Sequence, residues 1–146
     1  MTRQSPSTVY RTLLTIVGLV TCAGAYLADW NETHIYNPRW PPHAKFHNGQ
    51  TMSMGLTLGA ATFYYLWRPL KAESAKDNLH TVVIFASLYW ITQLSAILYP
   101  GTMFADPEFG ETFLQIYLFI GLSALIGIGY LFEIRRIEGT RKMATA

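Results

Sequence analysis

The run TFLQIYLFIGLSALIGIGYLF, residues 112–132, decides the fold class because it is long, apolar and free of charged residues. A helix needs about 20 predominantly apolar residues to cross a hydrocarbon core about 30 Å thick. Three earlier apolar runs have similar lengths, and the shortest of them gains length from the HAKFHNGQ segment before it. We therefore expect an all-α integral membrane protein with four transmembrane helices, over about residues 9–28, 44–67, 81–99 and 112–132.

The composition agrees with a helical membrane protein in one domain that covers residues 1–146. Of the 146 residues, 51% are hydrophobic and only 14% are charged, against about 25% charged residues in soluble domains. The apolar runs lack the alternation of a transmembrane barrel strand. A formal charge of +2 gives no reason to expect a nucleic-acid partner, and the single Cys22 excludes an internal disulfide and a Cys-rich metal site.

The basic residues predict how the helices are oriented in the membrane. Nine of the eleven Lys and Arg residues would lie on the side that holds both termini and the connection after residue 67. Short cytoplasmic loops carry such an excess of positive charge. We expect both termini in the cytoplasm and the histidine-rich loop, residues 29–50, on the non-cytoplasmic side. The lipid bilayer is thus the first expected partner.

The loop NETHIYNPRWPPHAKFHNGQ, residues 31–50, holds three of the four histidines of the chain. Two prolines at 41 and 42 favour the start of a helix. That helix would place His43 and His47 one turn apart on one face, which Gln50 continues toward the membrane. The turn signals between His34 and His43 let the loop fold back, so we expect His34 to approach the other two imidazoles.

The other predicted helices supply polar partners at a similar depth. Asp29 ends the first helix, Gln93 lies about two turns inside the third, and Glu111 and Gln115 share a face at the start of the fourth. Carboxylates and amides beside hydrocarbon are costly, and they usually face the interior of the protein or a pathway. The sequence therefore predicts a polar pocket at the non-cytoplasmic surface.

Histidine and carboxylate side chains in such a pocket predict acid–base chemistry on a lipophilic small molecule or a lipid. We expect His43 or His47 as general acid or base and Asp29 or Glu111 as the group that orients it. Isomerisation, cyclisation, hydrolysis and acyl transfer stay open, and no GxSxG motif indicates a serine hydrolase. The residues expected to position the substrate are His34, Asn48, Gln50, Gln93 and Gln115.

A metal site is a second interpretation of the same histidines. His34, His43 and His47, with Glu32 or Glu111 as a further ligand, offer enough nitrogen and oxygen donors for Zn²⁺ or non-haem iron. The spacing is less specific than an HExxH motif. The opposing interpretation is that these loop residues only cap helices and cover the rim of the protein.

A non-catalytic role is the main alternative to an enzyme. Gly55 and Gly59 form a GxxxG motif, which lets helices approach closely within one chain or between chains. An accessory or structural subunit, or a binding protein, would use this surface to join a second copy of the chain or a larger membrane complex. A transporter ranks third, because four short helices would need to oligomerise to enclose a pathway.

The segment ADWNETHIYNPRWPPHAKFHNGQTMSMG, residues 28–55, resembles the signature of a family of short four-span membrane proteins found in fungi and bacteria. The matching pattern is THxxNPxWPPHAKFHN. This family has no established activity, so the resemblance implies the helical architecture and singles out the loop. A looser similarity to emopamil-binding-type sterol isomerases and small membrane terpene cyclases extends to span number only, without a motif match.

Overall fold

The computed structural model describes residues 5–110 and 112–145, and its regular elements are helices. Three short 3₁₀ helices accompany the long ones: η1 (Ala72–Ser74), η2 (Ala96–Leu98) and η3 (Pro107–Phe109). The all-α class expected from the sequence is confirmed. The four long helices are α1 (Thr8–Asp29), α2 (Pro42–Trp67), α3 (Ala75–Ser95) and α4 (Leu114–Thr145).

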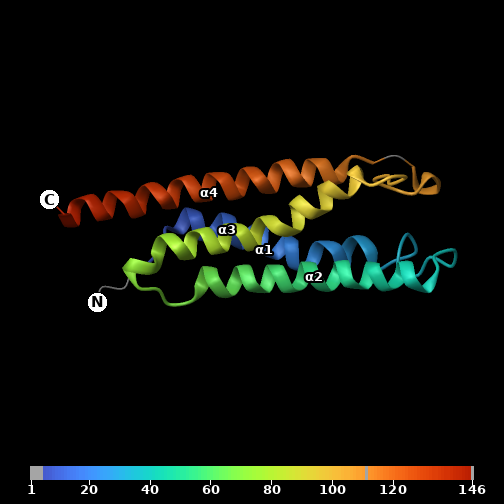
Figure 1. Cartoon of the computed structure of the whole chain (residues 1–146), viewed down its shortest axis with the longest axis horizontal. Helices are drawn as coiled ribbons and strands as arrows, with labels where there is room; N and C mark the ends of the chain where they lie inside the picture. Colours follow the sequence, from blue (N-terminus) through green and yellow to red (C-terminus); the bar gives the residue numbers. More distant parts are fainter. Residues whose placement is uncertain (1–4, 111, 146) are drawn as a thin grey trace.

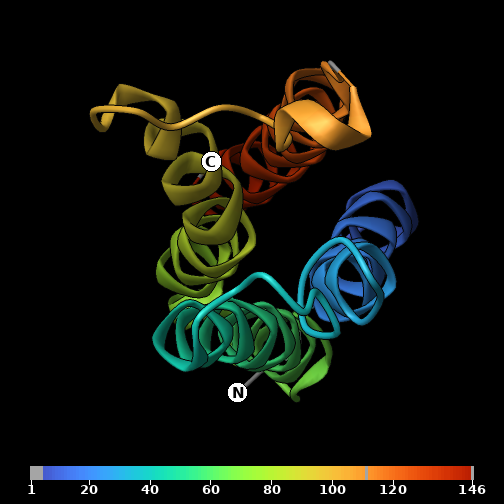
Figure 2. The same cartoon turned by 90° about the vertical axis from the view of Figure 1, so that its right-hand side faces the viewer.

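The long helices lie side by side and the chain reverses direction at each connection (Figure 1). Each of α1 and α3 contacts both α2 and α4, so the helices follow one another around a ring, as the end-on view shows (Figure 2). The two described chain ends and the connection around η1 lie at one end, which we call the terminal end. Residues 30–41, 96–110 and 112–113 lie at the opposite end, which we call the loop end.

Three helical segments within the described residues are long and apolar enough to cross a membrane. They support the expectation of a membrane protein. The remaining long helix, α2, is long enough, but its first turns carry the polar segment PHAKFHNGQ. The three spanning candidates are Thr8–Asp29, Ala72–Leu98 and Leu114–Met143.

The ends of the helices follow local sequence signals, with one difference from expectation. The side chain of Ser7 accepts a hydrogen bond from the backbone of Tyr10 and caps α1, and Pro42 opens α2. By contrast, α4 continues well past residue 132. Its extension buries Glu133, which accepts hydrogen bonds from Arg136 and from the backbone N–H of Ser7 at 2.9 Å.

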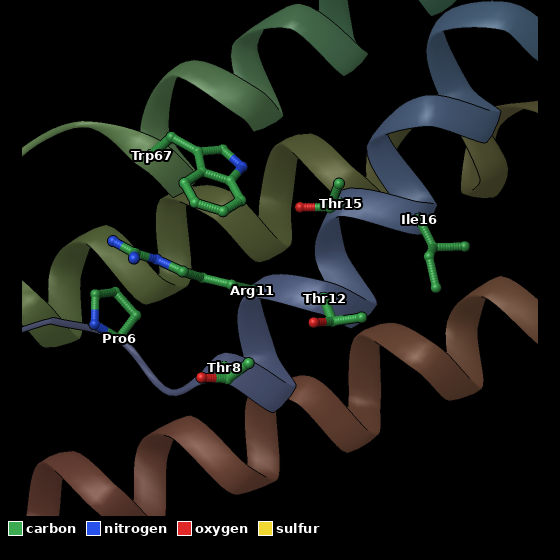
Figure 3. Close-up of a pocket in the computed structure, with 7 residues that line it drawn as sticks. All are labelled: Pro6, Thr8, Arg11, Thr12, Thr15, Ile16 and Trp67. Carbon is green, nitrogen blue, oxygen red and sulfur yellow. The ribbon is translucent and has the colours of Figure 1, made fainter.

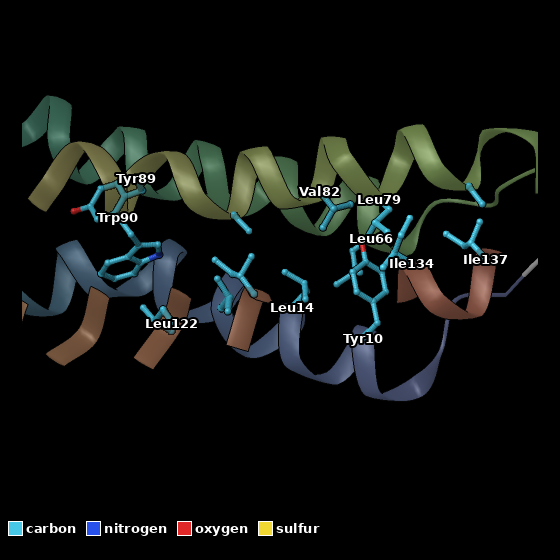
Figure 4. Close-up of a cluster of buried hydrophobic side chains, with 14 of the residues drawn as sticks. Tyr10, Leu14, Leu66, Leu79, Val82, Tyr89, Trp90, Leu122, Ile134 and Ile137 are labelled. Atoms are coloured by element: carbon cyan, nitrogen blue, oxygen red, sulfur yellow. The ribbon is translucent and has the colours of Figure 1, made fainter. Parts of the chain in front are cut away.

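The core runs along the centre of the four helices and draws side chains from each (Figure 4). One polar link crosses it, a 2.9 Å hydrogen bond from Trp90 Nε1 to the hydroxyl of Thr21. The labelled core side chains are Tyr10, Leu14, Leu66, Leu79, Val82, Tyr89, Trp90, Leu122, Ile134 and Ile137.

The GxxxG motif makes the close contact between α1 and α2. A Cβ atom at Gly59 would lie 2.3 Å from Sγ of Cys22 and 2.9 Å from the carbonyl oxygen of Gly18. A Cβ at Gly55 would lie 2.9 Å from the carbonyl oxygen of Thr21. Both glycines are buried inside the chain, so this motif serves internal packing and does not form a free face for a second copy.

Candidate functional site

The site begins with a hydrogen bond between two residues that the sequence singled out. Asp29 is the last residue of α1, and Asn48 lies within the first two turns of α2. Nδ2 of Asn48 donates to Oδ2 of Asp29 at 2.8 Å. Asn48 is buried, and the side chain of Asp29 is 15% exposed. This bond therefore joins the two helices at the loop end and fixes the carboxylate.

His34 reaches this carboxylate from the turn that follows α1. Backbone hydrogen bonds from the N–H of His34 to Asn31 and from Ile35 to Asp29 reverse the chain tightly. The turn places Nε2 of His34 3.8 Å from Oδ1 of Asp29. The other side of the ring meets the Trp40 indole edge to face, with ring centres 5.0 Å apart. The imidazole is thus held beside the carboxylate while part of it stays exposed.

The hydrogen bonds around Thr33 determine which nitrogen of His34 carries a proton. Nδ2 of Asn31 donates to the carbonyl of Ala28, so Oδ1 of Asn31 can only accept. The Thr33 hydroxyl donates its single hydrogen to that oxygen at 2.6 Å. The Thr33 oxygen must therefore accept from Nδ1–H of His34, 2.7 Å away. Nε2, which faces Asp29, is the nitrogen left to gain or lose a proton.

The surroundings of Asp29 contain one buried acceptor without a partner and a phenol. Oδ1 of Asn48 is buried and has no hydrogen-bond partner among the described residues. Tyr89 is buried, interacts electrostatically with Asp29 and packs over Gly55. An unsatisfied buried acceptor is costly. The site can therefore accept a hydrogen bond from a bound hydroxyl or amine.

The loop between α3 and α4 is tied to the histidine-rich loop by side chains. Asn37, which is 1% exposed, donates to Glu108 at 3.5 Å and accepts from the backbone of Arg39. Arg39 forms an ion pair with Glu108, and Trp40 Nε1 donates to Asp106 at 3.4 Å. The segment around Asp106 and Glu108 is thus anchored to the turn that carries His34.

A pocket of about 400 Å³ lies within the loop between α3 and α4. Gln115, at the start of α4, donates to the carbonyl oxygen of Phe104, a pocket residue, at 2.9 Å. The other amide atom of Gln115, Oε1, is buried and has no partner among the described residues. The pocket is mainly apolar, and its lining includes Ile97, Met103, Phe104, Ala105, Pro107 and Phe113.

His43 and His47 occupy a different face of α2. Their Nε2 atoms lie 3.0 Å apart, and Nδ1 of His47 lies 3.2 Å from Oε1 of Gln50. All three side chains are exposed, whereas Asn48 points into the protein. The structure therefore pairs these imidazoles with one another and with Gln50, as the helical spacing predicts. It places them outside the group formed by Asp29, His34 and Asn48, which we call the Asp29 cluster.

Two further predicted site residues lie apart from this cluster. Gln93 is half-buried in α3, one turn beyond Tyr89. Glu111 lies outside the described residues.

The geometry gives no support to a metal centre at the loop end. Among the residues that the structure describes, no group of three or more His, Cys, Asp or Glu side chains could hold a metal ion. A zinc or iron site on His34, His43 and His47 would need the loop to rearrange. It stays a prediction without a matching geometry.

Tyr89 is the site residue that the sequence did not single out for a role, whereas the Asn37 amide was expected to hold a polar group of the substrate and not to join two loops. Tyr89 lies four residues before Gln93, so the two share a face of α3. Because Gln93 was expected to lie in the site, Tyr89 could have been predicted there as well. Asn37 in an Asn-Pro pair indicates a turn. Nothing in the sequence indicates that its partner is Glu108, 71 residues away.

A comparison with protein families places the chain. The model of a family described as "Family of unknown function (DUF6640)" matches residues 13–143. Curated proteins and solved structures gave no match. The matched range includes all the loop-end residues described above.

Proposed function

The chain belongs to DUF6640, a family of unknown function, and we propose that it is a membrane-embedded enzyme that performs acid–base chemistry on a lipophilic small molecule at its loop end. The observation that carries the proposal is the arrangement of His34 and Asp29. The half-buried carboxylate of Asp29, held by Asn48, faces Nε2 of His34. The other ring nitrogen of His34, Nδ1, is hydrogen-bonded to Thr33. His34 takes the role that the sequence gave to His43 or His47.

The proposed chemistry uses each group according to its contacts. Nε2 of His34 removes a proton from the substrate or returns one, and the Asp29 carboxylate stabilises the imidazolium. The separation of 3.8 Å between these atoms is longer than a hydrogen bond, so a polar substrate group can approach both. The free oxygen of Asn48 accepts a hydrogen bond from that group and holds it in place.

A lipophilic substrate fits the surroundings of the site. The apolar pocket near Gln115 offers about 400 Å³, within the range of ligand pockets, which is about 300–1,000 Å³. The loop that forms it is tied to the His34 turn through Asn37 and Arg39. We propose that the polar end of the substrate meets His34 and that its apolar part extends toward this pocket. Gln115 then positions the substrate through its unpartnered oxygen.

We propose that all four long helices cross the membrane, with the loop end on the non-cytoplasmic side. Support for α2 as a span comes from its packing between α1 and α3 along their length. Support for the orientation comes from the charges, because the terminal end carries Arg11, Arg68, Lys71, Lys76, Arg135, Arg136, Arg141 and Lys142.

The test starts from a lipophile that co-purifies with the full chain and is identified by mass spectrometry. That molecule is then incubated with wild type, His34→Gln and Asp29→Asn, and its conversion is followed by chromatography. We expect both variants to keep binding the molecule and to convert it about 10²–10⁴-fold more slowly. His80→Gln is the matched control, since His80 is exposed at the terminal end of α3.

The double variant His43→Gln/His47→Gln tests which histidine is the acid–base group: His34, as the structure suggests, or His43 or His47, as the sequence suggested. It should convert the molecule at the wild-type rate, because both side chains lie outside the Asp29 cluster. Loss of conversion in this variant, with full activity in His34→Gln, would overturn our assignment. A molecule that wild type binds and never converts would identify the chain as a binding protein, the alternative role.

A further inference from the structure

A second pocket, of about 350 Å³, opens at the terminal end between the start of α1 and the end of α2 (Figure 3). It lies at the other end of the helices from the proposed acid–base site and is independent of it. None of its lining residues is acidic. The lining includes Thr8, Arg11, Thr12, Thr15, Ile16 and Trp67.

Arg11 brings a positive charge into this pocket without a carboxylate partner among the described residues. Its guanidinium carbon lies 4.8 Å from the centre of the Trp67 ring, so the indole holds the cation by its face. Nε of Arg11 is buried and has no hydrogen-bond partner in the described part of the chain. A buried N–H donor of this kind is costly unless an acceptor meets it.

The threonines of the pocket add hydroxyl groups on the same side as Arg11. Seven other threonines in the described helices donate to the carbonyl four residues earlier: Thr21, Thr51, Thr57, Thr62, Thr81, Thr92 and Thr140. The hydroxyl of Thr15 is buried and has no partner among the described residues. Figure 3 shows the hydroxyl oxygens of Thr8, Thr12 and Thr15 directed toward the side where Arg11 and Trp67 lie.

We propose that this pocket binds the phosphate group of an anionic phospholipid. A guanidinium and several hydroxyls, with no acidic neighbour in the lining, match a phosphate in charge and in hydrogen bonding. The pocket also continues from Thr8 to Ile16, roughly 12 Å along the helix at 1.5 Å per residue. The helix residues that line it are polar as far as Thr15, and Ile16 at the far end offers an apolar contact for the start of an acyl chain.

The site lies where anionic lipid is expected. Trp67 ends α2 and is exposed, which is typical of an aromatic side chain at the membrane surface. The terminal end also carries most of the basic residues, and such ends attract anionic headgroups. A free phosphate ion would contact Arg11 and the threonines and would leave the apolar lining residues Pro6 and Ile16 without a partner. The lipid therefore explains more of the lining than the ion does.

Native mass spectrometry of the purified full chain in detergent tests the proposal with three probes. They are dioleoyl-phosphatidylglycerol, dioleoylglycerol, which lacks the phosphate, and inorganic phosphate. We expect the phosphatidylglycerol to bind and the dioleoylglycerol to bind at least about tenfold more weakly. Inorganic phosphate that binds as tightly as the lipid, and displaces it, would overturn the lipid as the ligand.

Variants then connect binding to the pocket. Arg11→Gln should weaken phosphatidylglycerol binding by about tenfold or more, because it removes the charged donor. Lys71→Gln, which removes an exposed charge at the same end, should leave it unchanged. Thr15→Val keeps the shape of the side chain and should weaken binding by a smaller factor. If Arg11→Gln fails to fold, Arg11→Lys and Thr15→Val carry the test, and wild-type affinity in both would overturn the proposal.

Discussion

Replacing Gly59 with alanine tests the close contact between α1 and α2 that sets the geometry of the fold. A Cβ atom there would lie 2.3 Å from Sγ of Cys22 and 2.9 Å from two backbone atoms, the nitrogen of Cys22 and the carbonyl oxygen of Gly18. Favourable contacts between carbon atoms lie at about 3.5–4.0 Å. The side chain of Cys22 can rotate away, but the backbone of α1 must move. Overpacking of this kind costs about 1–3 kcal/mol.

Gly49→Ala is the matched control, because Gly49 lies in the same helix and nothing approaches within 4 Å of a Cβ at that position. Both substitutions gain about the same helix propensity, close to 1 kcal/mol. The difference between the two variants therefore isolates the steric cost. We expect the free energy of unfolding of Gly59→Ala to be about 1–3 kcal/mol below that of Gly49→Ala.

The free energies are measured by titrating the protein in mixed micelles with sodium dodecyl sulfate and following tryptophan fluorescence. A double variant adds a second check. Cys22→Ala removes the sulfur, so it should relieve part of the cost of Gly59→Ala, while the contacts with backbone atoms remain. Equal stability of Gly59→Ala and Gly49→Ala would show that α1 and α2 lie farther apart at Gly59 than the contact with Cys22 requires.

Two further experiments test polar contacts at opposite ends of the protein. Glu133→Gln should lower the free energy of unfolding by about 1–3 kcal/mol, because the buried carboxylate accepts from Arg136 and from the N–H of Ser7; unchanged stability in the same titration would contradict that role. A double-mutant cycle of Arg39→Ala and Glu108→Ala should give a coupling of only about 0.2–1 kcal/mol, because the arginine is 68% exposed. A coupling of zero would mean that this pair does not join the loops.

The sequence predicted the positions of the helices well. Each of the four apolar runs overlaps one of the four long helices, and Pro41–Pro42 correctly marked the start of α2. The length of the apolar run 112–132 did not predict where α4 ends. The helix continues where hydrophobicity stops, because Glu133 turns inward to Ser7 and Arg136 while polar neighbours remain outside.

It was harder to predict which face of α2 points into the protein. Residues that face lipid and residues that face the protein interior are both apolar, so hydrophobicity does not distinguish them. The sequence hypothesis directed His43 and His47 inward, and the structure directs Asn48 inward. Gly55 and Gly59 do indicate the inward face of α2. At about 100° per residue, Asn48 is nearly in line with Gly55, seven residues later, whereas His47 is displaced by about 80°. A GxxxG face that packs against α1 therefore brings Asn48 with it.

The contacts that complete the candidate site join distant parts of the chain. Asp29 and His34 are close in sequence, and a turn between them could be expected. The bond from Asn48 to Asp29 and the approach of Tyr89 depend on how three helices pack. The link between Asn37 and Glu108 depends on two loops meeting. Local patterns do not specify such pairings.

The most direct test of the acid–base site is the ¹⁵N NMR spectrum of the His34 ring, assigned by its loss in His34→Gln. If the Thr33 hydroxyl accepts from Nδ1 as the hydrogen bonds require, neutral His34 carries its proton on Nδ1 and leaves Nε2 bare toward Asp29. Thr33→Val removes that acceptor and should release the preference for this tautomer. A neutral ring protonated on Nε2 in wild type would contradict the proton-transfer role of His34.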